Sequence, residues 1–164
     1  MSFARCIEFV LRAEGDTSDH PSDMGGFTQW GLSSKSYPDL DLSKLTLVQA
    51  MEIYKRDFWE PIQGDRLPAS LALVLFDWAV NSGVRTAVEN LQSALGNDLR
   101  VDGIMGRRSL AAVEKTNLTP LICKLLQRRS DDRINQAQRP DQRVFLRGWQ
   151  RRIIAVAIEA MQLA

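Results

Sequence analysis

The chain has 164 residues, of which 45% are hydrophobic and 25% are charged, and its formal net charge is +1. These values are typical of one globular unit with its own core, and they exclude a disordered chain. No run approaches the roughly 18 apolar residues of a membrane span, and Arg5, Glu8 and Arg12 exclude a secretory signal at the N-terminus. We therefore expect synthesis in the cytoplasm.

Helical periodicity accounts for most of the chain. Apolar spacing, caps and breaks predict helices over residues 3–14, 46–58, 68–81, 85–95, 107–115, 119–137 and 144–163. Thr46 is the expected N-cap of the second helix, and the helix over 68–81 is apolar nearly all round, as at the centre of a helical domain. The sequence thus predicts an all-α domain of about seven helices, with at most one short β-hairpin, within residues 24–33.

The side chains that commonly bind metals are few and poorly spaced. Cys6 and Cys123 lie in separate apolar runs, which predicts two buried free thiols, and His20 is the only histidine. The acidic residues of the first loop miss the spacing of a calcium-binding loop (Asp16, Asp19 and Asp23). We expect no bound metal and no cofactor.

The small net charge conceals an asymmetry along the chain. Residues 1–120 carry 12 Lys or Arg against 16 Asp or Glu, a net of −4, whereas residues 121–164 carry 9 against 4, a net of +5. The basic C-terminal part is interpreted first as a solvated helix face. Alternatively, this part could contact an anionic partner, and the candidate partners are peptidoglycan, an outer-membrane surface and nucleic acid.

The loop after the first helix carries groups suited to cleavage of a glycosidic bond. Glu14 closes the apolar run of that helix, Asp23 follows nine positions later, and Thr28 follows after a turn at Gly25-Gly26. A carboxyl held against the protein body can protonate a leaving oxygen, and a second, more hydrated carboxylate can direct water or stabilise positive charge on the sugar. An acidic surface loop that only bonds its own backbone is the alternative interpretation.

The same segment resembles the glycoside hydrolase family 108 muramidases, which are lysozyme-like. Glu14, Pro21, Asp23, Thr28 and Gly31 match the family's motif, as do Gly15, Gly25 and Gly26. The chain departs from the motif at Asp16, where the family has glycine, and at His20, where it has aspartate. The resemblance implies that Glu14 is the general acid. It implies that Asp23, or alternatively Asp19, is the second carboxylate, and that Thr28 positions a water.

Polar and aromatic residues in the central part give further candidates. Asp77 and Asn81 share one face of the helix over 68–81, where Asp77 is expected in a structural hydrogen-bond network and Asn81 beside a sugar. Among the four tryptophans, Trp30 and Trp59 are candidates for stacking on sugar faces, whereas two others are expected in the core (Trp78 and Trp149).

The second half resembles the peptidoglycan-binding segment that follows the family 108 catalytic segment. The matching residues are Leu91-Gln92, Gly96, Asp102-Gly103, Gly106 and Leu110, followed by Phe145, Gly148-Trp149 and Arg152. We expect a catalytic segment over residues 1–66 and a binding segment over 67–164, packed as one compact unit.

The resemblance implies a phage-type endolysin that cleaves the β-1,4 bond between N-acetylmuramic acid and N-acetylglucosamine, with peptidoglycan as partner and release through a holin. We expect a monomer. A non-catalytic wall-binding or secretion-assisting protein of the same fold is the alternative. A nucleic-acid-binding protein ranks last, because it leaves the motif loop unexplained. The residues alone do not distinguish inversion from retention.

Overall fold

The computed structural model describes residues 3–14, 17–18, 28–96 and 99–163. The helices are α1 (Phe3–Glu14), α2 (Leu47–Tyr54), α3 (Ala69–Ser82), α4 (Val84–Leu95), α5 (Arg107–Glu114), α6 (Leu118–Gln136) and α7 (Leu146–Met161). Three two-residue strands, β1 (Thr17–Ser18), β2 (Thr28–Gln29) and β3 (Leu32–Ser33), form one antiparallel sheet. All seven predicted helices are confirmed, with ends shifted by a few residues.

The central helix of the fold is α3, as its all-round apolar sequence predicts. Ten of its residues are buried, from Ser70 to Ala79, and it packs against α1, α4, α6 and α7. It ends at Gly83, whose φ of +88° is a backbone conformation that favours glycine. The core thus lies around α3, and the helices that carry the candidate site residues are placed by their contacts with it.

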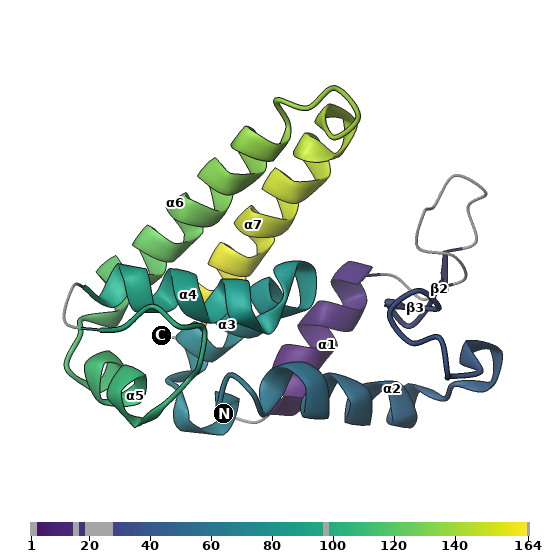
Figure 1. Ribbon diagram of the computed structural model, residues 1–164, viewed down its shortest axis with the longest axis horizontal. Coiled ribbons are helices and arrows are strands. Elements are labelled where there is room, and N and C mark those ends of the chain that lie inside the picture. Colours follow the sequence, from purple (N-terminus) through teal and green to yellow (C-terminus); the bar gives the residue numbers. More distant parts are fainter. Residues whose placement is uncertain (1–2, 15–16, 19–27, 97–98, 164) are drawn as a thin grey trace.

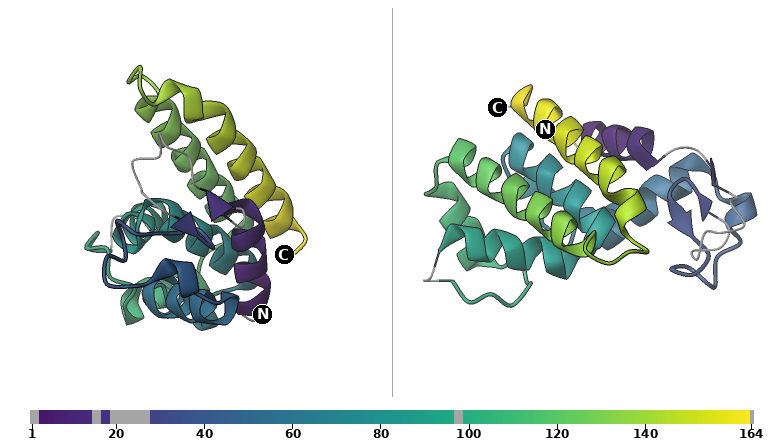
Figure 2. Two further views of the ribbon diagram at one scale, coloured as in Figure 1. Left: turned by 90° about the vertical axis from the view of Figure 1, so that its right-hand side faces the viewer. Right: turned by 90° about the horizontal axis from the view of Figure 1, so that it is seen from above.

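The α6–α7 pair forms a long helical hairpin that projects from the rest of the molecule, on the side opposite α2 (Figure 1). Seen from above, the strands lie at one end of the molecule and α5 lies toward the other (Figure 2). Trp149, expected in the core, is instead half-buried in this hairpin, where the Arg133 guanidinium lies 5.0 Å from its ring centroid. No helix among the described residues is long and apolar enough to cross a membrane.

The second predicted helix has two parts. Thr46 caps α2 as expected, because its hydroxyl accepts from the Gln49 N–H at 3.3 Å while the Gln49 side chain accepts from the Thr46 N–H at 2.9 Å. The chain then widens into a π-helical turn at Lys55–Trp59. This turn precedes Pro61, which cannot continue a helix.

The ring of Trp59 lies in an aromatic cluster in the core, packed edge-to-face against Phe3 at 5.5 Å and Phe76 at 5.4 Å. Its side chain is 1% exposed, and its indole N–H donates to Asp65 at 3.1 Å. The prediction that Trp59 stacks on a sugar is therefore wrong, because neither ring face is open. The π-helical turn, which the sequence pattern does not show, is the element that carries this ring.

Replacing Gly64 by alanine is expected to lower the free energy of unfolding by about 1–3 kcal/mol. The reason is steric, since a Cβ atom there would lie 2.4 Å from two ring carbons of the buried Trp59. Urea denaturation measures the effect. Gly148→Ala is the matched control, because no atom lies within 4 Å of its Cβ position and alanine favours a helix. Equal stabilities for the two variants would contradict the packing around Trp59.

The two cysteines differ from the expectation of two buried thiols. Both are free, and Cys6 is buried, but Cys123 is exposed. The difference lies in the register of α6, whose buried residues are Leu121, Leu125 and Arg129, a stripe that excludes position 123.

We expect a thiol reagent at pH 8 to modify Cys123 in the native protein and to leave Cys6 unmodified until unfolding. Burial blocks access to Cys6 and raises the pKa of its thiol from 9.0 to about 11, which leaves little of the reactive thiolate. A colorimetric count should give one thiol in the native protein and two in guanidinium chloride. Cys123→Ser should remove the fast reaction, and a fast thiol remaining in that variant would contradict the burial of Cys6.

Candidate active site

The C-terminal end of α1 is fixed by the core. Ile7 and Val10 are buried, and the Phe3 ring packs against Phe76 at 5.8 Å. Glu14 is the last residue of the helix and lies on the same stripe, at positions 3, 7, 10 and 14. The side chain of Glu14 lies outside the described residues, but the position of its backbone follows from the packing of α1.

The small sheet begins directly after α1. β1 starts three residues after Glu14, and its Ser18 is paired with Thr28 of β2. The chain therefore leaves the sheet at Ser18 and returns beside it at Thr28, which is half-buried and lies opposite Ser33 of β3. The pairing thus brings Thr28 close in the fold to the end of α1. Asp19 and Asp23 fall within the connecting segment, outside the described residues.

The sheet contains one more strand than expected. The expected hairpin is formed by β2 and β3, and β1 adds a third strand that pairs with β2. Two residues are too few to show the alternation by which a strand is recognised in a sequence. β1 follows α1 in the chain and pairs with β2, the strand that carries Thr28. It therefore helps to set the position of Thr28 relative to α1.

The turn between β2 and β3 is held by hydrogen bonds to Trp30. Both turn residues have positive φ, +52° at Trp30 and +78° at Gly31, as in the tight hairpin turns that suit twisted strands. The Trp30 indole N–H donates to the Leu45 carbonyl, and the Tyr54 hydroxyl donates to the Trp30 carbonyl, each at 3.1 Å. Trp30 is half-buried. Its contact with a sugar stays a prediction.

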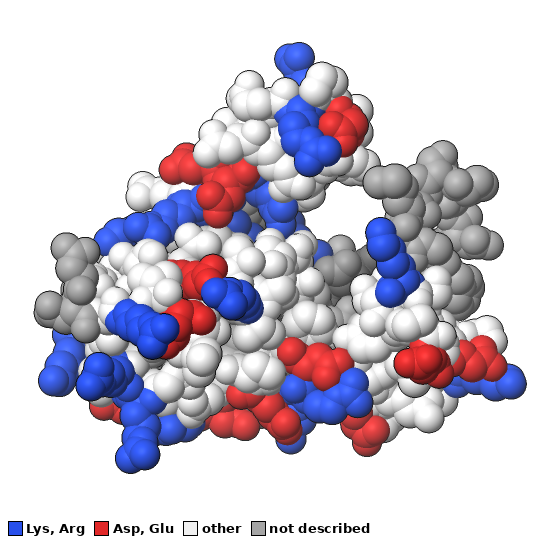
Figure 3. Space-filling model, viewed as in Figure 1, with Lys and Arg blue, Asp and Glu red and all other residues white. Residues whose placement is uncertain are grey.

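A cleft lies beside the end of α1. Figure 3 shows the surface hollowed between the α6–α7 hairpin and the part of the molecule that carries the strands. A cavity of about 520 Å³ lies between α1 and α7 and is lined on the α1 side by Phe9, Arg12 and Ala13. On the α7 side its wall includes Arg151 and Arg152. Since Ala13 precedes Glu14, this cavity adjoins the predicted catalytic position.

Asp77 is completely buried in an ion network, which confirms its structural interpretation. Its carboxylate pairs with Arg129 at 2.6 Å and with Arg152 at 2.8 Å. Asp77 is 0% exposed and Arg129 is 2% exposed, whereas Arg152 at 14% reaches the cavity wall. The pKa of the neighbouring Arg133 guanidinium is lowered, mainly by its burial and secondly by the positive charge of Arg129. The network connects α3 to both helices of the α6–α7 hairpin.

Asn81 is half-buried at the end of α3. Its side-chain N–H donates to the Asp77 carbonyl at 2.8 Å, one helical turn back. This bond stabilises the last turn of α3, and a contact between Asn81 and a sugar stays a prediction.

For Arg129 the interpretation of the basic C-terminal part as a solvated helix face is wrong, because this side chain is buried. A signal was present in α6, where Arg129 follows Leu121 and Leu125 at helical spacing on the buried stripe. An arginine on an apolar stripe indicates a buried ion pair.

Among the described residues, no group of three His, Cys, Asp or Glu side chains could hold a metal ion.

Comparisons with known proteins agree with the resemblance in both halves of the chain. A model of the family described as glycosyl hydrolase 108 matches residues 7–83, and a model described as a predicted peptidoglycan domain matches residues 86–154. No curated protein matches the chain. Among solved structures, Brucella abortus SagA is similar at 30% identity with a TM-score of 0.85, over 98% of this chain and 94% of SagA.

These matches confirm the predicted lysozyme-like, all-α fold. They also support the assignment of this chain to the proteins that hydrolyse or bind peptidoglycan. The chain belongs to the glycosyl hydrolase 108 family and carries a predicted peptidoglycan domain in its second half.

Proposed function

We propose that the protein is an N-acetylmuramidase that cleaves the β-1,4 bond between N-acetylmuramic acid and N-acetylglucosamine in peptidoglycan. Glu14 is the general acid that protonates the leaving oxygen. Asp23, with Asp19 as the alternative, is the carboxylate that directs water or stabilises positive charge on the sugar ring, and Thr28 positions the water. Trp30 and Asn81 are proposed to contact the sugars.

The observation that carries this proposal is the position of Glu14 as the last residue of α1, in a chain that belongs to a glycosyl hydrolase family. Two further observations support it. The pairing of Ser18 with Thr28 brings Thr28 close in the fold to the end of α1. The cavity beside Ala13 offers about 520 Å³ for part of a glycan strand.

The proposed biological setting is that of a phage endolysin. The protein is made in the host cytoplasm, reaches the periplasmic peptidoglycan after release through a holin, and acts as a monomer without a cofactor. The basic α6–α7 hairpin is proposed to touch the anionic outer membrane. We further propose a catalytic segment over residues 1–66 and a binding segment over 67–164 as functional divisions of one compact unit.

The proposal is tested by incubating the purified protein with insoluble peptidoglycan and measuring two quantities, new reducing ends in solution and protein in the pellet. A muramidase releases reducing ends in proportion to time and enzyme concentration. The predicted peptidoglycan domain favours a second candidate, a non-catalytic wall binder. That candidate is supported, and the muramidase refuted, if the protein pellets with the walls and releases no reducing ends.

A further inference from the structure

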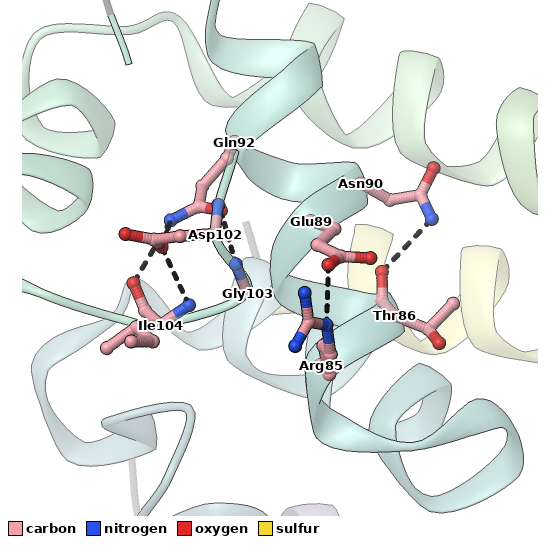
Figure 4. A network of polar contacts seen from close by, with 8 residues as sticks. All are labelled: Arg85, Thr86, Glu89, Asn90, Gln92, Asp102, Gly103 and Ile104. Carbon is pink, nitrogen blue, oxygen red and sulfur yellow. Dashed lines mark hydrogen bonds and ion pairs between the residues drawn. The ribbon is translucent and has the colours of Figure 1, made fainter. Parts of the chain in front are cut away.

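The buried side chain of Gln92 forms several hydrogen bonds to the loop before α5. The Gln92 carbonyl oxygen accepts from the backbone N–H groups of Asp102 and Gly103, both at 3.0 Å. The Gln92 amide N–H groups donate to the Asp102 carboxylate at 2.9 Å and to the Ile104 carbonyl at 3.0 Å (Figure 4). This loop is therefore a built surface with its own fixed geometry.

Gly103 is required for the same geometry. Its φ is +74°, and a Cβ there would lie 2.6 Å from the Arg85 side chain and 3.3 Å from the Arg85 carbonyl oxygen. The Gln63 side-chain N–H also donates to the Met105 carbonyl, so the loop is anchored to the core on both sides. These bonds fix the backbone of the loop and therefore the points from which its outer side chains extend.

Two neighbouring cavities lie on the outside of this loop and share Leu99 and Arg108 as lining residues. The first has a volume of about 330 Å³ and also contains Arg100 and Arg107 in its wall. The second has a volume of about 430 Å³ and extends along α5 to Lys115. Together they form a groove, named here the α5 groove, which runs from the loop along the helix.

The α5 groove carries excess positive charge. Residues 99–116 hold four cations, Arg100, Arg107, Arg108 and Lys115, against the two carboxylates of Asp102 and Glu114. None of the four cations forms an ion pair with a described residue. The Asp102 carboxylate accepts from Gln92 and from the Ile104 N–H, which holds its pKa below the ordinary value.

The groove also has an apolar edge. Ile104 is 66% exposed, although the backbone on both sides of it is fixed. Figure 3 shows the basic side chains gathered over α5, at the opposite end of the molecule from the strands. A ligand in the α5 groove would therefore be separate from a glycan strand bound beside α1.

We propose that the α5 groove binds the stem peptides of peptidoglycan, with the free carboxylates of the peptide paired to Arg107 and Arg108. This inference rests on the proposed function for its substrate. Stem peptides combine several carboxylates with small alanine methyl groups, which suit a cationic groove with an apolar edge. The glycan backbone itself offers hydroxyl and acetamido groups and few charges. Binding at two separated points on one polymer raises the effective concentration of glycan at the cleft.

The test compares Arg107→Ala/Arg108→Ala with Arg139→Ala/Arg143→Ala, which removes the same charge from the exposed end of the α6–α7 hairpin. The probes are intact sacculi, pelleted at 4 °C, and glycan strands freed of stem peptides by an amidase, which are soluble without their peptide cross-links and are therefore attached to beads before pelleting. We expect the α5 variant to raise the apparent Kd for intact sacculi at least about tenfold. We expect the hairpin variant to bind intact sacculi like wild type, and all three proteins to bind the peptide-free glycan equally.

The inference is overturned if the α5 variant binds intact sacculi like wild type, or if both variants weaken equally. It is also overturned if binding of the α5 variant to peptide-free glycan falls to the same extent, because the groove would then recognise the glycan or charge in general. Release of reducing ends is measured in parallel. A protein that releases none yet shows the expected difference in binding would refute the muramidase and retain the α5 groove as a peptide site.

Discussion

Asp77→Asn is expected to lower the free energy of unfolding by about 3–5 kcal/mol. The substitution keeps the shape of the side chain and removes the buried charge with which the Arg129 and Arg152 guanidinium groups pair. Arg129 cannot recover hydration, since it is 2% exposed. Urea denaturation followed by far-UV circular dichroism measures the loss.

Two controls separate the buried network from a general effect of charge. Asp141→Asn removes an exposed partner of Arg139 and should leave the unfolding midpoint unchanged. Arg129→Met in the Asp77→Asn background should recover part of the lost stability, because it removes the buried positive charge that Asp77 pairs with in the wild type. If Asp77→Asn and Asp141→Asn had equal midpoints, the network would not be a major source of stability.

Glu14→Gln is expected to lower the rate of reducing-end release from peptidoglycan by about 10² to 10⁴-fold. Glutamine has nearly the same volume and can form hydrogen bonds, but it cannot transfer a proton to the leaving oxygen. Stability and pelleting with the walls should be unchanged. The measurement is the initial rate at matched enzyme concentration.

Glu8→Gln is the matched control for this variant, because Glu8 lies on the same helix and is exposed. It should retain the wild-type rate. A Glu14→Gln enzyme that keeps more than about a tenth of the wild-type rate would contradict the role of Glu14 as general acid. An equal loss in both variants would indicate an effect of the charge of α1 rather than of one proton donor.

Much of the fold could be predicted from the sequence because its helices have strong local signals. The N-cap residue Thr46, the nearly all-apolar run of α3 and the glycine at position 83 each predict a boundary or a burial that the structure confirms. Such signals depend on neighbouring residues only, and the helices are long enough to show their period.

The errors arise where long-range packing decides. Trp59 enters the core through a π-helical turn that brings its ring against Phe3 and Phe76, a contact that joins distant parts of the chain. Arg129 is buried because Asp77, 52 positions earlier, supplies its counter-ion. Cys123 shows the opposite error, because it was expected to be buried and the register of α6 places it on the exposed side of the helix. Neither the ring contacts of Trp59 nor the partner of Arg129 is encoded in a window of a few residues.

The candidate site could be predicted in its outline and not in its geometry. The motif that begins at Glu14 identifies the family and the end of α1, whereas the pairing of Ser18 with Thr28 and the contribution of α7 to the cavity emerge only from the folded chain. The α5 groove is a similar case. The motif of the peptidoglycan-binding segment includes Gln92, but only the structure shows that Gln92 bonds the backbone of the loop beside the four cations.

The central claim is that Glu14 supports cleavage of one particular glycosidic bond, and the most direct measurement identifies the new chain ends. Peptidoglycan digested by wild type and by Glu14→Gln is reduced with borohydride, and the soluble fragments are analysed by mass spectrometry. Our account predicts fragments ending in reduced N-acetylmuramic acid from wild type and almost none from Glu14→Gln. Fragments ending in reduced N-acetylglucosamine, or equal release by the two proteins, would contradict it.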